Sequence, residues 1–269
     1  MIEQDIRDQI LHGVKGKIFL ARISADGNGI LSGIQRLQHA CKGLGIRVIT
    51  CKKAGEKVKT SEVIALIEGH AKQIVLGEEE LMGWIAKASG IATAAWKAKR
   101  MAGKSLEVVS GAWKKMPPPI KQMVRQAIVD GGIRYQISGR PFIYLDKNYV
   151  KILGGVKPTL DFVKDFKPFI KVIQLKSKDK ILSKESALAA QLGANIIMID
   201  TGKKEDIKRV HDGLRKQGLR ENVKIAFGGN ISVEDLTVLK KMPVDIVDIG
   251  KAIVDAPLLD MRIDVMDRI

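Results

Sequence analysis

Short β-rich runs alternate with amphipathic segments between residues 106 and 249. The runs are Leu106–Val109, Arg134–Ile137, Phe142–Leu145, Phe169–Leu175, Asn195–Ile199, Val223–Phe227 and Asp245–Ile249. Between them, Ser183–Leu192, Glu205–Gln217 and Val233–Lys241 have apolar residues at helical spacing. This alternation favours parallel strands joined by right-handed crossovers. It predicts a closed or nearly closed β/α barrel, with an open doubly wound sheet as the alternative.

The first hundred residues follow a different pattern, which is typical of an α+β arrangement. We expect helices over Asp5–His12, Gly33–Gly43 and Glu78–Ala102. We expect strands over Lys17–Ile23 and Gly45–Cys51, and a strand, a turn and a second strand within Gly55–Gly69.

Composition excludes several classes of protein. The apolar stretches are too short to span a membrane, and an aromatic content of 4% argues against a surface that stacks on nucleic-acid bases. The net charge of +16 attracts polyanions in general, but no nucleic-acid recognition motif accompanies it. Cys41 and Cys51 form neither a disulfide framework nor a zinc motif, which indicates reduced thiols in a cytoplasm.

Polar residues and glycines follow the predicted strands, at the ends where parallel sheets and barrels place their chemistry. They are Ser110, Gly111, Lys114, Lys115, Ser138–Arg140, Lys147, Gln174, Lys176, Asp200, Thr201, Gly228, Gly229, Asn230, Gly250 and Lys251. The last two loops of a β/α barrel commonly hold phosphate on backbone N–H groups, and glycine lets the backbone approach the anion. We therefore expect a multiply phosphorylated small molecule to bind at Gly228, Gly229, Asn230, Gly250 and Lys251.

Five segments stand out by their order and spacing. They are Gly55–Gly69, Ser89–Ala94 (SGIATA), Gly193–Asp200 (GANIIMID), Phe227–Gly229, and Asp245–Gly250 followed by Ala256–Asp260 (APLLD). Together they resemble the quinolinate phosphoribosyltransferases, or nicotinate-nucleotide pyrophosphorylases (carboxylating), over nearly the whole chain.

The resemblance implies an α/β fold with two domains. An N-terminal α/β sandwich would take residues 1–104 and be joined by a returning strand at 256–269. An incomplete β/α barrel would take residues 105–255. The resemblance also implies a homodimer in which the partner's N-terminal domain completes each active site.

The resemblance further implies a reaction of pyridine nucleotide biosynthesis. Family members transfer a 5-phosphoribosyl group from its diphosphate to a pyridine nitrogen, with magnesium; pyrophosphate leaves, and quinolinate then loses CO2. Lysines and a metal would stabilise the departing pyrophosphate. Lys115, Lys147 and Asp200 are the expected catalytic residues. Asp200 and Asp248 are the expected magnesium ligands, although Asp248 could instead form a salt bridge.

The chain departs from the family pattern in its basic motifs. Where the family has D-T-R-K-T-T-P-G-L-R, this chain has AWKKMPPPIK over residues 112–121. Lys115 keeps the family's lysine, whereas Lys114 and Lys121 stand where the family has arginines. Lysine keeps the charge but loses the bidentate fork of arginine. We expect Lys114 and Lys121 to bind substrate.

Other positions change more strongly. The family's H-R pair falls on Gln136 and Ile137, with Arg134 or Arg140 as the nearby substitute, and its K-D-N-H motif keeps only Lys147. Its acidic position on the fourth strand falls near Gln174 or Lys176. We expect Gln136, Arg140 and Lys176 to contact the substrate.

Glu79 is the sharpest departure, because the family has there an arginine that reaches the partner's site. A carboxylate facing a dicarboxylate in a dry site would oppose quinolinate. We therefore expect a phosphoribosyltransferase-like enzyme with an altered acceptor pocket for a pyridine or related acid, in which Glu79 contacts the acceptor. Two alternatives stay open: a genuine quinolinate phosphoribosyltransferase with compensating residues, and a non-catalytic paralogue that binds a phosphorylated ligand or an oxyanion.

Overall fold

The computed structural model describes residues 5–177 and 179–268, which form two compact units. Unit 1 comprises Met1–Trp96, Pro117–Gly132 and Asp255–Ile269. Unit 2 comprises Lys97–Met116 and Ile133–Val254. The predicted domain limits differ from this division chiefly at residues 117–132, which they assign to the barrel.

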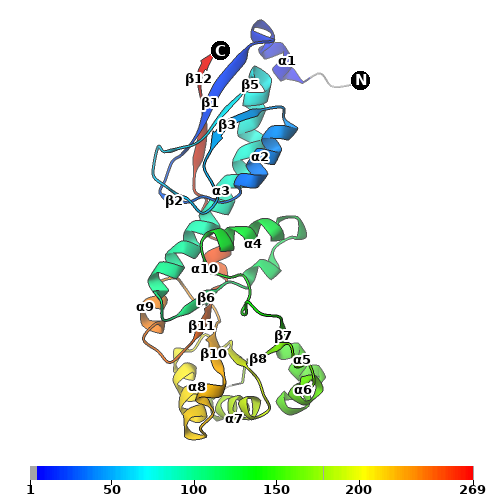
Figure 1. Ribbon diagram of the computed structural model, residues 1–269, viewed down its shortest axis with the longest axis vertical. Coiled ribbons are helices and arrows are strands. Elements are labelled where there is room, and N and C mark those ends of the chain that lie inside the picture. Colours follow the sequence, from blue (N-terminus) through cyan, green and yellow to red (C-terminus); the bar gives the residue numbers. More distant parts are fainter. Residues whose placement is uncertain (1–4, 178, 269) are drawn as a thin grey trace. The chain divides into compact units, whose positions relative to one another are not determined.

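A four-stranded antiparallel sheet forms the centre of unit 1 (Figure 1). Its strands, in spatial order, are β12 (Met261–Arg268), β1 (Ile18–Ala25), β5 (Val63–His70) and β3 (Arg47–Cys51). The short strands β2 (Gly29–Ile30) and β4 (Lys57–Val58) pair separately. The helices are α1 (Ile6–Ile10), α2 (Ile34–Gly43), α3 (Ala71–Ala102) and α4 (Lys121–Asp130), with 3-10 turns η1 (His12–Val14) and η3 (Pro118–Ile120).

The core of unit 1 lies between this sheet and the helices α2 and α3. Ile23 and Ile67 of the sheet, Leu37 of α2, and Leu81 and Ile85 of α3 are fully buried in one cluster. The predicted C-terminal strand is confirmed, since β12 pairs antiparallel with β1. The unit is thus closed by the last strand of the chain.

Helix α4 belongs to unit 1 because it packs closely on α3. A Cβ atom on Gly131, just after α4, would lie 2.3 Å from the carbonyl oxygen of Ala92. The Ser32 hydroxyl also donates to Asp130 at 2.6 Å.

Six parallel strands form a curled, incomplete barrel in unit 2. In spatial order they are β6 (Glu107–Val109), β11 (Ile246–Asp248), β10 (Lys224–Phe227), β9 (Ile196–Ile199), β8 (Ile170–Leu175) and β7 (Phe142–Leu145). The connecting elements are η2 (Ala112–Lys115), α5 (Lys147–Ile152), α6 (Val156–Val163), α7 (Asp179–Gln191), α8 (Lys204–Lys216), η4 (Arg220–Asn222), α9 (Leu236–Leu239) and α10 (Lys251–Val254). The predicted incomplete barrel is therefore confirmed.

One predicted strand, Arg134–Ile137, is wrong. This segment makes only an isolated bridge between Val109 and Arg134. The Arg134 carbonyl accepts from the backbone N–H of Ser110, but the next three carbonyl groups are bound by side chains instead of by a neighbouring strand. Trp113 donates to the carbonyl of Tyr135, and the Arg134 guanidinium donates to the carbonyls of Gln136 and Ile137. The chain thereby turns before β7 begins.

The predicted helices differ most from the observed ones in length at α3 and α9. Helix α3 begins at Ala71, seven residues before the expected Glu78, since Gly77 lies inside the helix and does not break it. Helix α9 covers only Leu236–Leu239 of the expected Val233–Lys241.

Candidate active site

The strand register of unit 2 brings the carboxyl ends of all six strands to one edge, which we call the carboxyl edge. Leu175 lies opposite Ile199, and Ile199 lies opposite Phe227. The next residues of these three strands, Lys176, Asp200 and Gly228, therefore leave the sheet side by side.

Strand alternation decides which residues of this edge face the barrel interior. Val109, Val172, Met198, Ala226 and Ile246 form the interior cluster, and Tyr144 packs against it. Because side chains alternate with a period of two, the next inward positions lie two residues further along each strand. They are Gly111, Asp146, Gln174, Asp200, Gly228 and Asp248.

Asp200 is held from two sides. Its Oδ2 atom accepts a hydrogen bond of 2.6 Å from the Gln174 amide nitrogen and lies 2.8 Å from the Lys176 Nζ atom. The Gln174 amide oxygen in turn accepts from the backbone N–H of Lys147 at 3.2 Å. Three neighbouring strand ends are thus joined by one chain of polar contacts.

Asp248 forms a second centre of negative charge. Its Oδ1 accepts from the backbone N–H of Gly111 at 2.9 Å. Burial raises the pKa of the Asp248 carboxyl above its ordinary value of 3.8, and the charge of Asp200 acts in the same direction. The Gly111 N–H and the charges of Lys114 and Lys115 favour ionisation of this carboxyl and partly oppose the rise.

Tyr144 connects these groups. The Lys114 Nζ atom lies 4.9 Å from the centroid of its ring, which is cation–π distance. The pKa of Tyr144 is raised, first by burial and then by the charges of Asp248, Asp200 and Asp146. The three carboxylates are therefore close enough to act on one phenol.

Tyr144 and Asp146 are absent from the sequence-based site. The signal that could have found them is the alternation along β7, which turns both inward together with Phe142. Asp146 also has a structural task, because it caps α5 by accepting from the N–H groups of Asn148 and Tyr149 at 2.8 and 3.1 Å.

Gly228 and Gly229 form the turn after β10, beside the loop after β9. Gly229 has φ of +107°, and a Cβ on it would lie 2.6 Å from the nitrogen of Gly202. The Gly202 N–H donates to the Gly228 carbonyl at 3.1 Å. Packing of two loops thus accounts for the glycines, and phosphate binding there stays a prediction. Among the described residues, no acceptor takes the N–H groups of Gly229 and Asn230.

Gly250 and Lys251 follow β11, where α10 begins. Gly250 accepts from the N–H groups of Ile253 and Val254, and Lys251 is exposed. Lys115, the last residue of η2, and Lys147, the first residue of α5, are exposed as well. The edge therefore combines three inward carboxylates with several lysines that reach solvent.

Arg140 lies elsewhere. With Ser138, Gly139 and Arg134 it lines a cavity of about 500 Å³ whose other residues include Ile170, Ile196 and Ile246, at or next to the starts of β8, β9 and β11. The expected position of Ser138–Arg140 at the carboxyl edge is wrong, because the strand predicted before them does not form. Gln136 is exposed just before this segment, and its carbonyl accepts from Arg134.

Lys121 and Glu79 both lie in unit 1, Lys121 at the start of α4 and Glu79 on α3. Both Glu79 oxygens accept from the Arg7 Nη2 atom, at 2.7 and 2.8 Å. The Glu79 side chain is 59% exposed. In this single chain Glu79 is thus an exposed carboxylate paired with Arg7, and its contact with an acceptor stays a prediction.

Asp200, one of the two residues expected to hold magnesium, fits that ion poorly. A magnesium ion prefers several oxygen ligands in octahedral geometry, but Asp200 already meets an ammonium and an amide N–H, which are both donors. Within residues 5–177 and 179–268, no group of three or more His, Cys, Asp or Glu side chains is arranged to hold a metal. Magnesium stays a prediction.

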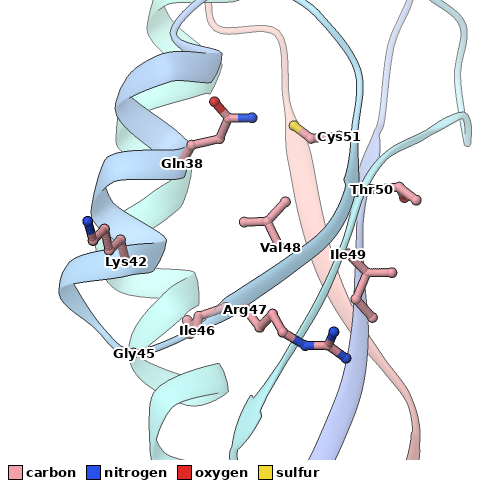
Figure 2. Close-up of a pocket in the computed structure, with 9 residues that line it drawn as sticks. All are labelled: Gln38, Lys42, Gly45, Ile46, Arg47, Val48, Ile49, Thr50 and Cys51. Atoms are coloured by element: carbon pink, nitrogen blue, oxygen red, sulfur yellow. The ribbon is translucent and has the colours of Figure 1, made fainter.

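Unit 1 has a groove of its own between α2 and β3, which Figure 2 shows. It is lined by Gln38, Lys42, Gly45, Ile46, Arg47, Val48, Ile49, Thr50 and Cys51. None of these is a predicted site residue. Both thiols of the chain, Cys41 and Cys51, are free, and burial raises the pKa of Cys41 to about 11.

No helix in the described part of the chain has the length and apolar character that crossing a bilayer requires.

Comparison with known proteins agrees with this fold. The chain resembles the probable nicotinate-nucleotide pyrophosphorylase [carboxylating] of Archaeoglobus fulgidus, with 28% identity over 248 residues that cover 91% of this chain and 94% of the relative. The human nicotinate-nucleotide pyrophosphorylase [carboxylating] is 24% identical over 249 residues, which cover 90% of this chain and 81% of the relative.

Solved structures share the fold. The nicotinate-nucleotide pyrophosphorylase of Francisella tularensis aligns with a TM-score of 0.82 at 18% identity, over 99% of this chain and 91% of the other. That of Pyrococcus furiosus aligns with a TM-score of 0.83 at 21% identity, over 97% and 73%.

Two family models together match almost the entire chain. The model of the quinolinate phosphoribosyl transferase N-terminal domain matches residues 5–89, and that of the C-terminal domain matches residues 91–264. The chain therefore belongs to the quinolinate phosphoribosyltransferase family.

Proposed function

We propose that this protein transfers a phosphoribosyl group from phosphoribosyl diphosphate to the ring nitrogen of an aromatic acid. The observation that carries the proposal is the carboxyl edge, which gathers Lys114, Lys115, Lys147 and Lys176 around inward carboxylates in a chain of this family. Developing negative charge on a leaving diphosphate is stabilised by such preorganised cations.

Individual residues take distinct parts in this proposal. Lys115 and Lys147, both exposed at the edge, bind the oxygens of the diphosphate. The free N–H groups of Gly229 and Asn230 bind the 5-phosphate. For Asp200 the proposed part is to stabilise the positive charge that develops on the ribosyl carbon.

For the acceptor, we propose a pyridine or related acid other than quinolinate. Lys114, at the carboxyl edge, binds a carboxylate as a point charge and lacks the planar fork that arginine offers. A second carboxylate on the acceptor would therefore gain less here than in an arginine-lined pocket.

Quinolinate itself is the second candidate, and one observation favours it. Arg7 is held on Glu79 by two short hydrogen bonds, so that a guanidinium accompanies the carboxylate at this position. The charge that would repel a dicarboxylate is thereby balanced.

A kinetic comparison separates these candidates. The protein is incubated with phosphoribosyl diphosphate and either quinolinate, nicotinate or related ring acids, and release of pyrophosphate is followed. We expect kcat/KM for a monoacid to exceed that for quinolinate. A higher value for quinolinate would support the second candidate, and Arg7→Ala should then remove that preference.

A thermal-shift titration tests the third reading, a non-catalytic paralogue. A ligand that binds only the folded state adds about 2.7 kcal/mol at 100 times its Kd. Stabilisation by phosphoribosyl diphosphate without any turnover, across all acceptors, would favour that reading.

The shared-site homodimer and the cytoplasmic location stay predictions.

A further inference from the structure

The contacts of Asp200 assign an unexpected role to its neighbour Lys176. The register of β8 and β9 places Leu175 opposite Ile199, so that Lys176 and Asp200 leave the sheet as neighbours. Their Nζ and Oδ2 atoms lie 2.8 Å apart, which is the distance of a charge-assisted hydrogen bond. The carboxylate is thus neutralised by a residue of its own chain.

Gln174 fixes the same arrangement from the barrel interior. Its amide oxygen accepts from the Lys147 N–H, which turns its amide nitrogen toward Asp200. Asp200 therefore faces two hydrogen-bond donors, whereas a metal ligand needs an open side. The Asp200 side chain is only 20% exposed, so little of it is left for a further cation.

The Lys176 ammonium has donors to spare. An ammonium carries three N–H groups, of which Asp200 takes one. The Lys176 side chain is 43% exposed, so the remaining donors are open to an anion at the carboxyl edge.

We propose that Lys176 takes the charge role of a divalent cation at Asp200, so that diphosphate anions bind this edge without a protein-held metal ion. The inference rests on the proposed function, since it concerns the diphosphate of the phosphoribosyl donor. Magnesium is then not needed as a bridge between Asp200 and the diphosphate. It is also not needed to screen the diphosphate from the negative charge of Asp200.

Isothermal titration calorimetry with inorganic pyrophosphate and with phosphoribosyl diphosphate tests this, in EDTA and in magnesium chloride. For the unmodified chain we expect Kd values that agree within about threefold between the two buffers. For Lys176→Ala we expect about 10- to 100-fold weaker binding in EDTA, because Asp200 then faces the diphosphate uncompensated.

Two further variants separate this role from a structural one. Lys176→Ala combined with Asp200→Asn should recover affinity in EDTA, because the repelling charge is gone. Lys216→Ala, at the end of α8 and exposed, should leave both Kd values unchanged. If Lys176→Ala fails to fold, as judged by thermal melting, Lys176→Gln replaces it.

A direct readout of metal binding completes the test. Electron paramagnetic resonance of Mn²⁺ should show no protein-bound ion for the unmodified chain and a bound ion for Lys176→Ala. Binding of phosphoribosyl diphosphate only in magnesium, or an unchanged metal dependence in Lys176→Ala, would overturn the inference and leave the proposed function standing. If neither ligand binds in either buffer, the proposed function itself fails.

Discussion

The amino edge of the six-stranded sheet in unit 2, where its parallel strands begin, and the carboxyl edge, where they end, carry similar residue types but use them differently. At the amino edge, Arg134 pairs with Glu107, and Arg220 pairs with Asp245 at 2.8 Å. These pairs also bind nearby backbone groups, so their charges are used in holding the fold. At the carboxyl edge, Lys115 and Lys147 reach solvent.

The contacts of Asp245 and Asp248 show how a charged cluster that stabilises the fold differs from one that can bind a ligand. Asp245 accepts both from Arg220 and from the N–H of Ile225, which fixes the start of β10. Asp248, at the carboxyl end of β11, instead accepts from a single backbone N–H. The charges of Lys114 and Lys115 act on its carboxyl group. The charged side chains at the amino edge thus pair with each other and stabilise the fold. The lysines in excess at the carboxyl edge are instead available to a ligand.

The largest expected effect is on stability, from Gly229→Ala. The new Cβ would lie 2.6 Å from the Gly202 nitrogen, at φ of +107°. We expect a loss of about 3 kcal/mol in the free energy of unfolding, measured in urea. Gly139→Ala is the matched change at the amino edge, where no atom lies within 4 Å, and it should cost less than about 0.5 kcal/mol. Equal effects would contradict the close packing of the two loops.

Next in size is the effect of Lys115→Ala on catalysis. Removal of one cation that stabilises the leaving diphosphate should lower kcat/KM by about 100-fold, while the melting temperature stays near that of the unmodified chain. Lys224→Ala, an exposed lysine of the amino edge, serves as the control. A similar loss of kcat/KM in both variants would mean that these lysines act only through the net charge of the protein.

Arg220→Ala should reverse this pattern. The variant leaves Asp245 with only the N–H of Ile225 and removes the side-chain donor to the Val223 carbonyl. We expect about 1.5 kcal/mol lower stability in urea unfolding, with an unchanged Kd for phosphoribosyl diphosphate by calorimetry. Weaker binding without a loss of stability would place the ligand at the amino edge.

The smallest expected effect is a pH dependence from Asp248. Its pKa is raised in the folded state, chiefly by burial, so the folded chain binds the proton more tightly than the unfolded chain. The contribution of this group to stability therefore falls as pH rises from the unfolded value near 3.8 and levels off above the folded pKa. Asp248→Asn should gain in stability relative to the unmodified chain over that window, as urea unfolding at a series of pH values would show. A constant difference would contradict the raised pKa.

The sequence predicts the barrel because the alternation of apolar runs and helices depends on local periodicity. Six of the seven expected runs became strands, and Phe142–Leu145 has the observed bounds of β7. Arg134–Ile137 has strand-like composition too, but long-range side-chain contacts from Trp113 decide its conformation. Periodicity contains no information about such contacts.

The candidate site was predictable in part for the same reason. That lysines and glycines follow the strands is visible in the sequence, whereas their partners depend on register. The pair of Lys176 and Asp200 needs Leu175 opposite Ile199, and the pair of Arg7 and Glu79 joins residues 72 positions apart. The predicted contacts of Lys121, Gln136, Lys251 and Glu79 with substrate stay predictions.

Hydrogen–deuterium exchange of the chain with and without phosphoribosyl diphosphate tests most directly that the carboxyl edge is the site. We expect the ligand to slow exchange in the segments 111–116, 146–148, 200–202 and 228–230, and to leave 134–140 and 220–224 unchanged. Slower exchange confined to the segments 134–140 and 220–224 would place the ligand at the amino edge and contradict the account.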